Sequence, residues 1–432
     1  MISKVNFKKI MTLLGLLGMM VSLSVIGSST GFAAKEITYM VVGAAPFSDV
    51  VLERLPEFEK QTGIKVKVVP VPHAHTFEKT IIEAVGRTGA YDVIQIDRPM
   101  VAPFGEMNLL LPLRKYVSDT VINQFFDHHK KHGTFNGVLY ALPHSNDIRA
   151  LYYRTDLFAK AGIPGPPDTW EEWLDASIKT NELSPDVYGL LVAGFKGRGV
   201  WILSDFVYQA GSQILDENNN PAFNDAKGTK GLKFFVDMYR KYKVLPPGTP
   251  DYIWQDTRML FAKGVAAMVS EFNDIIPLLE DPTQSVVSGK YDLALLPKDK
   301  RRGTNNGGWL VGIPVGTRNP KEAGKLIDWL LSVPIQKHMC YRSGTLSGNK
   351  ATLQEIVAET EPTNIRTDPR SQGRWKFYQE IMLTTYELPR TSAWPEISDI
   401  LSEALSAALI GEKTPEQAFN DAAEEIKILM GS

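Results

Sequence analysis

Apolar and polar residues are arranged along the first part of the chain in patterns that predict alternating strands and helices. Residues 37–42 form an apolar run of strand length. In residues 64–68 apolar positions alternate with lysines, which predicts a strand with one solvated face. Residues 49–61 and 76–85 read as helices, and residues 91–96 as a third strand. Strands that alternate with helices predict a parallel sheet covered by helices.

Ligands of such sheets bind beyond the carboxyl ends of the strands. Two loops lie there in the predicted sheet, residues 43–48 after the first strand and residues 97–99 after the third. Asp97 is therefore a candidate ligand-binding residue. The alternative is that Asp97 only stabilises a turn, which is a common role for aspartate.

The stretch from residue 137 to residue 173 has the most detailed pattern in the chain. Residues 138–142 and 148–153 read as two short strands, and the polar sequence His-Ser-Asn-Asp separates them. Residues 155–162 read as a short helix ended by a glycine. Thr169, with Glu172 three positions later, predicts a capping box at the start of another helix.

The remainder of the chain mixes helical periodicity with short strands. Residues 194–201 form a glycine-rich basic loop, and residues 228–242 an amphipathic helix. Strands are predicted at residues 265–269, 291–296 and 310–314. Two further helix starts are predicted, at Asn319-Pro320 and at Thr414-Pro415 with Gln417. The last helix carries one apolar stripe, formed by Phe419, Ala422, Ala423, Ile426 and Leu429.

Residues 1–33 have the layout of a secretory signal peptide. Lys4, Lys8 and Lys9 precede an apolar segment, and Gly31-Phe32-Ala33 predicts cleavage before Ala34. A retained membrane anchor is the alternative. No cysteine lies near this site, which argues against a lipoprotein, and the single Cys340 cannot form an internal disulfide. We therefore expect the processed protein in the periplasm.

Composition narrows the possible functions. The 432 residues carry a formal net charge of −2 with both signs interspersed, unlike the basic surface of a nucleic-acid-binding protein. After the apolar N-terminal segment, no stretch approaches the length of a membrane span. The chain is long enough for two domains with separate cores.

Together these segments resemble the extracellular solute-binding proteins of family 1, the maltose-binding-protein-like subunits of sugar-type ABC importers. The resemblance rests on residues 137–173 and on three later stretches, GGWLVGIPVGTRNPKEAGKLIDWL, SGTLSGNKATL and LPRTSAWPEISDILSEALSAALIGEKTPEQAFNDAAEEI. It implies an α/β fold of two lobes (type II periplasmic-binding-protein-like), with three crossings between lobes and a ligand cleft at the hinge. The implied N-terminal lobe comprises residues 34–145 and 298–343, and the implied C-terminal lobe residues 146–297 and 344–432.

The resemblance also implies which residues contact a ligand. Aromatic rings cover the apolar face of a sugar, and planar polar side chains bond its hydroxyls. Asp147 matches an acid of the family that bonds hydroxyls, and Trp309, which follows Gly308, matches a stacking tryptophan. Further candidates are Asn146, His144, Trp201, Arg198, Glu271, Phe272, Arg390 and Trp394. Each of these could instead serve packing, turn formation or a surface loop.

Metal chemistry and catalysis are not indicated by the sequence. His128 and His132 have the i,i+4 spacing that can bind zinc, but lysines intervene and no third ligand is near. A solvated helix end is the preferred interpretation, and we expect no metal and no cofactor. The roles of His73 and His75 stay open. The nucleophile-elbow, phosphate-loop and HExxH motifs are missing.

The sequence therefore predicts a binding protein and not an enzyme. It would capture a sugar, oligosaccharide or sugar alcohol by hinge closure and deliver it to the permease subunits of an ABC importer, acting as a monomer. Two alternatives stay open. One is the same fold binding a phosphorylated polyol such as a glycerol-phosphate ester, with Arg198 and Arg390 serving the phosphate. The other is a secreted carbohydrate-active enzyme.

Overall fold

The structure is a computed structural model that describes residues 35–43, 46–72, 75–195 and 199–431. The predicted signal peptide (1–33), His73 and Arg198 lie outside the described residues. Residues 36–432 belong to one compact unit, and the account below concerns that unit. Among the described residues, no helix combines the length and the apolar character needed to cross a membrane.

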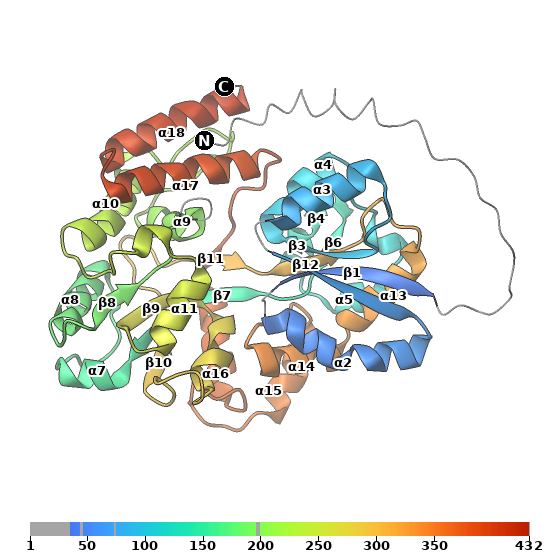
Figure 1. Cartoon of the computed structure of the whole chain (residues 1–432), viewed down its shortest axis with the longest axis horizontal. Helices are drawn as coiled ribbons and strands as arrows, with labels where there is room; N and C mark the ends of the chain where they lie inside the picture. The colour runs from blue at the N-terminus through green and yellow to red at the C-terminus, as the bar shows by residue number, and fades with distance from the viewer. Residues whose placement is uncertain (1–34, 44–45, 73–74, 196–198, 432) are drawn as a thin grey trace, which may run out of the picture. The chain divides into compact units, whose positions relative to one another are not determined.

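The first lobe is built on a five-stranded sheet with the order β2-β1-β3-β12-β6. Strands β1 (Glu36–Val42), β2 (Lys65–Val71) and β3 (Val93–Asp97) are parallel, as the alternation of strands and helices predicted. Strands β12 (Trp309–Gly312) and β6 (Ala141–Pro143) join them in antiparallel pairing. The first lobe therefore combines a parallel start with two strands contributed from far along the chain (Figure 1).

Side chains of the first sheet alternate between two apolar layers, because successive residues of a strand point to opposite faces. Ile37, Tyr39 and Val41 of β1 pack in one cluster, and Met40 in the cluster on the other face. The helices of this lobe are α2 (Pro46–Thr62), α3 (Thr76–Gly86), α4 (Val101–Glu106), α5 (Asp119–Gln124), α6 (Asp127–His132), α13 (Pro320–Leu330) and α14 (Val333–Ser343), with the 3-10 turns η3 (Arg98–Met100) and η4 (Leu113–Lys115). Helix α15 (Lys350–Glu359) packs against α14, and its Ile356 lies in an apolar cluster with Ile148 and Val269 of the second sheet. A hairpin of β4 (Thr134–Phe135) and β5 (Val138–Leu139) completes it.

The second lobe is built around strand β7 (Asp147–Arg154), in which every residue is buried. The sheet order is β13-β11-β7-β9-β8, and β10 also pairs with β7. The strands are β8 (Tyr188–Leu191), β9 (Ala266–Phe272), β10 (Tyr291–Ala294), β11 (Thr304–Gly307) and β13 (Thr385–Tyr386). A strand buried on both faces reads as a nearly continuous apolar run, which is why the Ile148–Tyr153 part of β7 was visible in the sequence.

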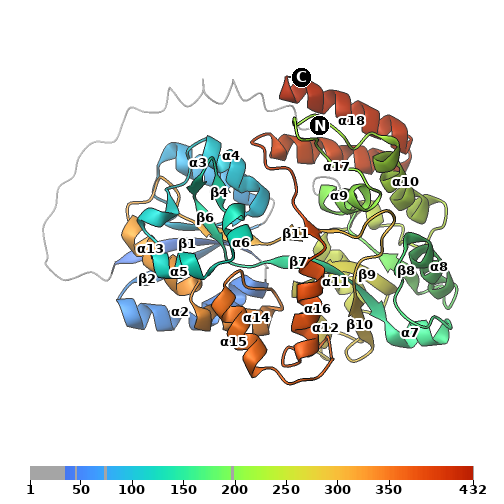
Figure 2. The same cartoon turned by 180° about the vertical axis from the view of Figure 1, so that it is seen from behind.

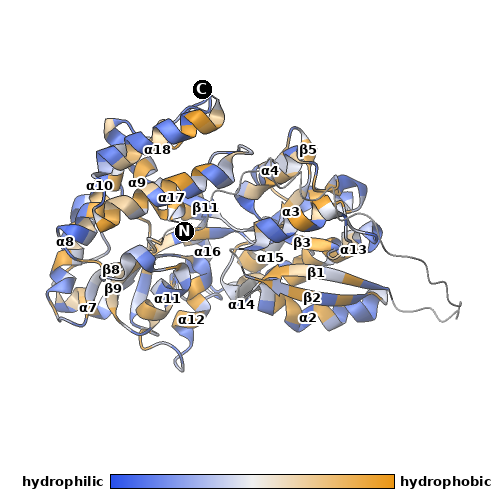
Figure 3. Cartoon of the chain, turned by 45° about the horizontal axis from the view of Figure 1, so that its top comes forward, coloured by the Kyte–Doolittle hydropathy of each residue, from blue (hydrophilic) through white to orange (hydrophobic). Residues whose placement is uncertain are grey.

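Helices cover the second sheet and supply most of its core. They are α7 (Thr155–Lys160), α8 (Trp170–Asn181), α9 (Val200–Gln209), α10 (Ala226–Arg240), α11 (Trp254–Ala262), α12 (Ile276–Glu280), α16 (Gln372–Met382), α17 (Trp394–Ile410) and α18 (Pro415–Met430), with η5 (Thr249–Asp251) and η6 (Asn273–Ile275). The capping box predicted at Thr169 is confirmed, and the helix start predicted at Thr414 is confirmed and also forms a capping box with Gln417. Figure 3 shows hydrophobic and hydrophilic residues side by side on α17 and α18, as expected for amphipathic helices.

Short segments connect the two lobes next to one another (Figures 1 and 2). Residues 144–146 join β6 to β7, and Gly308 alone separates β11 from β12. At Gly308 the backbone has φ +118°, and a Cβ there would lie 2.3 Å from the carbonyl oxygen of Ser145. Leu346 lies beside Asn146, and each backbone N–H donates to the other residue's carbonyl, at 2.9 and 3.0 Å.

Some local predictions differ from the structure. The predicted strand at 138–142 is divided between the β4–β5 hairpin and β6, because Tyr140 belongs to neither. Asn319 precedes α13 but does not cap it, since its side-chain amide donates to Asp92. Leu429 is 40% exposed and does not continue the buried stripe of α18. Strand β11 lies in the second sheet, so the chain returns to the first sheet at Gly308 and not at the predicted boundary of 298.

Candidate ligand-binding site

A pocket lies where the carboxyl ends of β1 and β3 face the start of β7 and helices α9 and α11. Its volume is about 670 Å³ including the solvent at its mouth. The lining residues are Val42, Gly43, Asp97, Asp147, Trp201, Trp254, Gln255, Arg258, Phe272, Asp274, Gly307, Gly308 and Trp309. Both lobes contribute, and the position at the strand ends of the first sheet agrees with the rule for parallel sheets.

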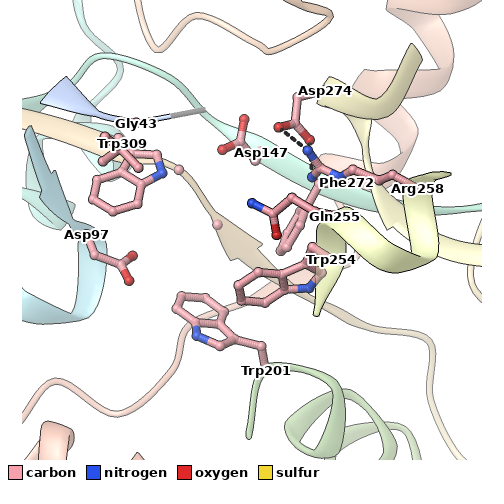
Figure 4. A pocket seen from close by; sticks show the side chains of 13 residues that line it. Gly43, Asp97, Asp147, Trp201, Trp254, Gln255, Arg258, Phe272, Asp274 and Trp309 are labelled. Carbon is pink, nitrogen blue, oxygen red and sulfur yellow. Dashed lines mark hydrogen bonds and ion pairs between the residues drawn. The ribbon is translucent and has the colours of Figure 1, made fainter. Parts of the chain in front are cut away.

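Strand register brings three predicted residues to this pocket. Trp309 is paired with Asp97 across β12 and β3, and Gly307 with Asp147 across β11 and β7. Directly opposite residues of an antiparallel pair point to the same face. The tripeptide Gly307-Gly308-Trp309 therefore places an acid of each lobe on the pocket wall (Figure 4).

Aromatic rings enter the pocket from both lobes (Figure 4). Trp309 comes from the first lobe, and Trp201, Trp254 and Phe272 from the second. Phe272 is held from behind by the guanidinium of Arg149, which lies 4.4 Å from the centre of its ring. Flat apolar surfaces on two sides suit the C–H faces of a sugar or polyol, and polar groups between them suit its hydroxyls.

Trp309 also belongs to the first-lobe core. It is 7% exposed and packs with Val42, Val50 and Met339. One edge of the side chain is thus fixed by packing while another lines the pocket. A binding residue held in this way is preorganised, because its rotamer does not have to be selected when a ligand arrives.

Arg258 joins two acids at the second-lobe side of the pocket. Its Nε donates to Glu271 at 2.6 Å, and its two terminal nitrogens donate to the two oxygens of Asp274 at 2.9 and 2.6 Å. Burial alone would lower the pKa of Arg258, but the charges of Asp274 and Glu271 outweigh burial and raise that pKa. The guanidinium is therefore a permanent cation whose charge is paired with both acids.

Asp147 is a buried acid of the pocket, and one of its carboxylate oxygens lacks a hydrogen-bond donor in the part of the chain that the structure describes. It is 7% exposed, and its Oδ1 has no hydrogen-bond partner among the described residues. Burial, followed by repulsion from Asp274, raises its pKa well above the ordinary value, although Arg258 and Arg98 act in the opposite direction. A buried acceptor without a donor is costly, so a ligand that supplies a hydroxyl donor here would remove part of that cost.

The structure places several predicted site residues elsewhere. Glu271 is completely buried behind Arg258 and does not line the pocket. Asn146 is buried and accepts from Arg98, while Trp394 is 1% exposed and packs in the second-lobe core. Arg390 lines a smaller cavity, which shares Trp201 with the ligand pocket, and donates to the carbonyl of Thr134. His144 is fully buried and is not among the lining residues.

Four lining residues with aromatic, polar or charged side chains were missed by the sequence analysis, namely Trp254, Gln255, Arg258 and Asp274. The first three share helix α11, whose N-terminal turn points at the pocket (Figure 4). A tryptophan at the start of a polar helix could have indicated this face. Asp274 follows the strand end Glu271-Phe272 that the sequence did single out. Asp274 could therefore have been predicted as a site residue, because it follows the end of a strand that faces the cleft.

The segment that contains His128, His129 and His132 also differs from the predicted solvated helix end. His129 and His132 are 3% and 4% exposed, and Nε2 of His132 lies 2.7 Å from Glu387. Burial lowers the pKa of His132 to about 4, with Arg98 acting in the same direction. Among the described residues, no group of three or more His, Cys, Asp or Glu side chains could hold a metal ion.

The fold and the pocket define a class of protein. Two α/β lobes, joined by short crossings, enclose a pocket to which both contribute rings and acids. Ligand binding between lobes is the arrangement of a two-lobed solute-binding protein, in which closure is driven by contacts to both sides.

Comparison with known proteins places the chain in a family. Residues 41–337 match the family of bacterial extracellular solute-binding proteins, and the chain belongs to that family. The mannitol-binding protein of Pseudomonas aeruginosa is 23% identical over 84% of this chain and 85% of its own length. The galactooligosaccharide-binding protein of Bacillus subtilis is 23% identical over 88% of this chain and 86% of its own.

Solved structures show the same fold. Maltose-bound MalE3 of T. maritima has a TM-score of 0.84 and 25% identity, covering 92% of this chain and 100% of that one. A solute-binding protein of an ABC transporter from Agrobacterium radiobacter K84, in complex with ribitol, has a TM-score of 0.79 and 27% identity, covering 91% and 98%. The predicted two-lobe, type II fold is confirmed.

Proposed function

We propose that the protein binds a neutral sugar, oligosaccharide or sugar alcohol and presents it to the permease of an ABC importer. The observation that carries this proposal is the buried carboxylate of Asp147, which lies between aromatic rings of both lobes. The carboxylate can accept hydrogen bonds from the hydroxyls of a sugar or polyol, while the rings on either side cover its C–H faces. Relatives that bind mannitol, and solved relatives that hold maltose or ribitol, support the same ligand class.

A phosphorylated polyol fits this pocket less well. Among the described lining residues the one cation is Arg258, and its charge is already paired with Glu271 and Asp274. Arg390, which was expected to serve a phosphate, does not line this pocket but a smaller cavity that shares Trp201 with it. A phosphate would also add negative charge beside Asp97, Asp147 and Asp274, where repulsion between acids already contributes to raising the pKa of Asp147. A neutral ligand avoids these costs.

The remaining parts of the proposal concern processing and partners. The protein would be exported to the periplasm, lose residues 1–33, and act as a monomer that meets the permease after closing on its ligand. It would return its ligand chemically unchanged. Membership of a family of solute-binding proteins supports binding without turnover.

A thermal-shift panel tests the ligand class. Purified protein would be melted with D-mannitol, ribitol, D-tagatose, maltose, maltotriose and glycerol 3-phosphate. A ligand that binds only the folded state raises the melting temperature. We expect stabilisation by at least one neutral compound and none by glycerol 3-phosphate. Stabilisation by the phosphate alone would contradict the proposal, and recovery of a hydrolysed product would identify an enzyme.

A further inference from the structure

Residues 387–390 form a connection that touches both lobes, and we call it the strap. It follows β13 and precedes α17, so both of its ends belong to the second lobe. Tyr386, immediately before the strap, donates its hydroxyl to Asp205 at 3.0 Å, and Leu388 packs in the second-lobe core. The strap is therefore firmly attached on the second-lobe side.

On its other side the strap contacts three elements of the first lobe. Oε1 of Glu387 lies 2.7 Å from Nε2 of His132 on α6 and 3.8 Å from Nη1 of Arg98 on η3. Arg390 donates to the backbone carbonyl of Thr134 on β4. These contacts are made by side chains of the strap alone, without a ligand in between.

Arg98 and His132, both partners of Glu387, are buried and depend on its carboxylate. Arg98 and His132 are buried, with side chains 6% and 3% exposed, so neither can readily turn to water if Glu387 is lost. At neutral pH the imidazole is neutral, because burial lowers the pKa of His132 to about 4. Nε2 then donates to the carboxylate. Arg98 supplies the opposite charge.

The same network reaches the ligand pocket. Arg98 follows the pocket residue Asp97 directly, and its Nη2 donates to Asn146 at 3.0 Å. Asn146 in turn precedes the pocket residue Asp147 and is bonded to Leu346 at the crossings. A change at Glu387 would thus be transmitted to the two loops that hold the pocket acids of the two lobes.

We propose that the strap, through Glu387, holds the two lobes in the orientation that forms the pocket, independently of any ligand. Glu387 is in this view a positioning residue, since it does not line the ligand pocket. It favours the pocket-forming orientation by contacts that a more open arrangement of the lobes would lose. A bias of this kind lowers the free energy that a ligand must supply for closure.

Distance measurements on the ligand-free protein test this proposal. Spin labels would be attached through Lys79→Cys on α3 and Lys233→Cys on α10, one in each lobe. Both lysines are exposed, and the native Cys340 is completely buried and should stay unlabelled. We expect one dominant distance in the parent protein. In Glu387→Ala we expect a second, longer population, and in Glu387→Gln a smaller one, because glutamine still accepts from His132 but lacks the charge for Arg98.

The chain offers a closely matched control in Glu53. This glutamate is 45% exposed and is bonded to His338 at 3.2 Å and Arg342 at 2.9 Å, whereas Glu387 is 47% exposed. Its partners lie on α14, which packs beside α2 in the first lobe (Figure 1). Glu53→Ala should leave the distance distribution unchanged. Any effect common to both variants would reflect general loosening.

The outcomes separate clearly. A distribution in Glu387→Ala that equals the parent's would overturn the proposal, and so would an equal change in Glu53→Ala. Should Glu387→Ala not fold, Glu387→Gln and Arg390→Ala carry the same test, and two unchanged distributions would again overturn it. Small-angle scattering of the unlabelled variants checks that the labels are not responsible. No ligand is used, so the result does not depend on the proposed sugar specificity.

Discussion

Asp97 and Trp309 face each other across the antiparallel strands β3 and β12, and both line the pocket. The acid ends one strand and the ring begins the other, so the backbone pairing alone sets their spacing. Neither residue depends on a flexible loop for its position. A site placed on paired strands is more rigid than a site placed on loops, which favours a preformed ligand surface.

Trp309 should contribute to both binding and stability. Trp309→Ala removes stacking area, and we expect binding of the best-stabilising sugar to weaken by about 2 kcal/mol or more. The ligand-free protein should also melt lower, because Trp309 packs with Val42, Val50 and Met339. Trp309→Phe should restore much of the melting temperature and less of the affinity. Calorimetric titration and melting curves measure the two effects.

A matched control for Trp309 is Trp173, which is 2% exposed and stacks on Phe206 in the second-lobe core. Trp173→Phe should lower the melting temperature and leave the affinity almost unchanged. Equal losses of affinity in the two phenylalanine variants would mean that Trp309 acts only through packing.

Asp147 should lower the stability of the ligand-free protein and strengthen ligand binding. Because burial raises its pKa in the folded protein, the folded state penalises the charged form at neutral pH. Asp147→Asn removes that penalty, so the ligand-free variant should melt higher than the parent at pH 7. The advantage should shrink as the pH falls toward about 4, where the unfolded aspartate also becomes protonated. Binding should weaken by about 1–3 kcal/mol, since a ligand hydroxyl loses an acceptor.

Asp156 provides the control with the opposite sign. Its hydrogen bond to Arg154 outweighs burial and lowers the pKa of this acid in the folded state. Asp156→Asn should therefore melt lower than the parent at pH 7, with unchanged affinity. If Asp147→Asn also melts lower at pH 7, the pocket acid is stabilised by groups that outweigh its burial, and our account of its role is wrong.

His132 should make the protein sensitive to mild acid. Burial lowers its pKa to about 4 in the folded protein, compared with about 6.5 for an unfolded histidine. Between these values the unfolded state binds more protons, so stability is complete above about pH 6.5 and falls as the pH decreases. His132 faces Glu387, Arg98, His128 and His129.

The contribution of His132 is measured by comparing the pH dependence of the melting temperature in the parent protein and in His132→Gln. His132→Gln should show a shallower loss of melting temperature between pH 6.5 and pH 4.5 than the parent. Buried groups that do not contact His132 titrate equally in both proteins and cancel in the comparison, so the difference reports His132 together with its neighbours His129 and Glu387. Parallel pH profiles for the two proteins would show that His132 does not titrate differently on unfolding.

Much of the fold was predictable because regular patterns reflect local physics. The βαβαβ start of the first lobe, the burial of β7 and the capping boxes at Thr169 and Thr414 all follow from residues that are near in sequence. Strand β11 was missed because Thr304–Gly307 is polar and glycine-containing. Its strand character comes from pairing with β7 and β13, which no local pattern encodes.

The site was predictable where a residue ends a strand or matches the family pattern, as for Asp97, Asp147 and Trp309. Residues on helices were harder, because the sequence shows which face is apolar but not what that face meets. Trp254 and Arg258 were missed, and Trp394 was placed in the site although it is a core residue. The burial of Glu271 could likewise not be foreseen, since it depends on Arg258 from another element.

The close approach of the crossings at Gly308 leads to the last prediction. A methyl group at this position would lie 2.3 Å from the carbonyl oxygen of Ser145 and 2.9 Å from Cα of Asn146, both backbone atoms. Gly308→Ala should therefore force the crossings apart and move Trp309 away from Asp147.

Gly289 serves as the control for Gly308. It also has a positive φ of +69°, but nothing lies within 4 Å of an added Cβ. Gly289→Ala should cost about 1–2 kcal/mol from its backbone conformation alone, without loss of affinity. We expect Gly308→Ala to lose several kcal/mol more and to bind at least tenfold more weakly, because backbone atoms cannot move aside as side chains do. Denaturant melts and calorimetric titration of both variants measure this difference. Equal stability losses with unchanged affinity would show that the crossings tolerate the added methyl group and that Gly308 does not set the geometry of the pocket.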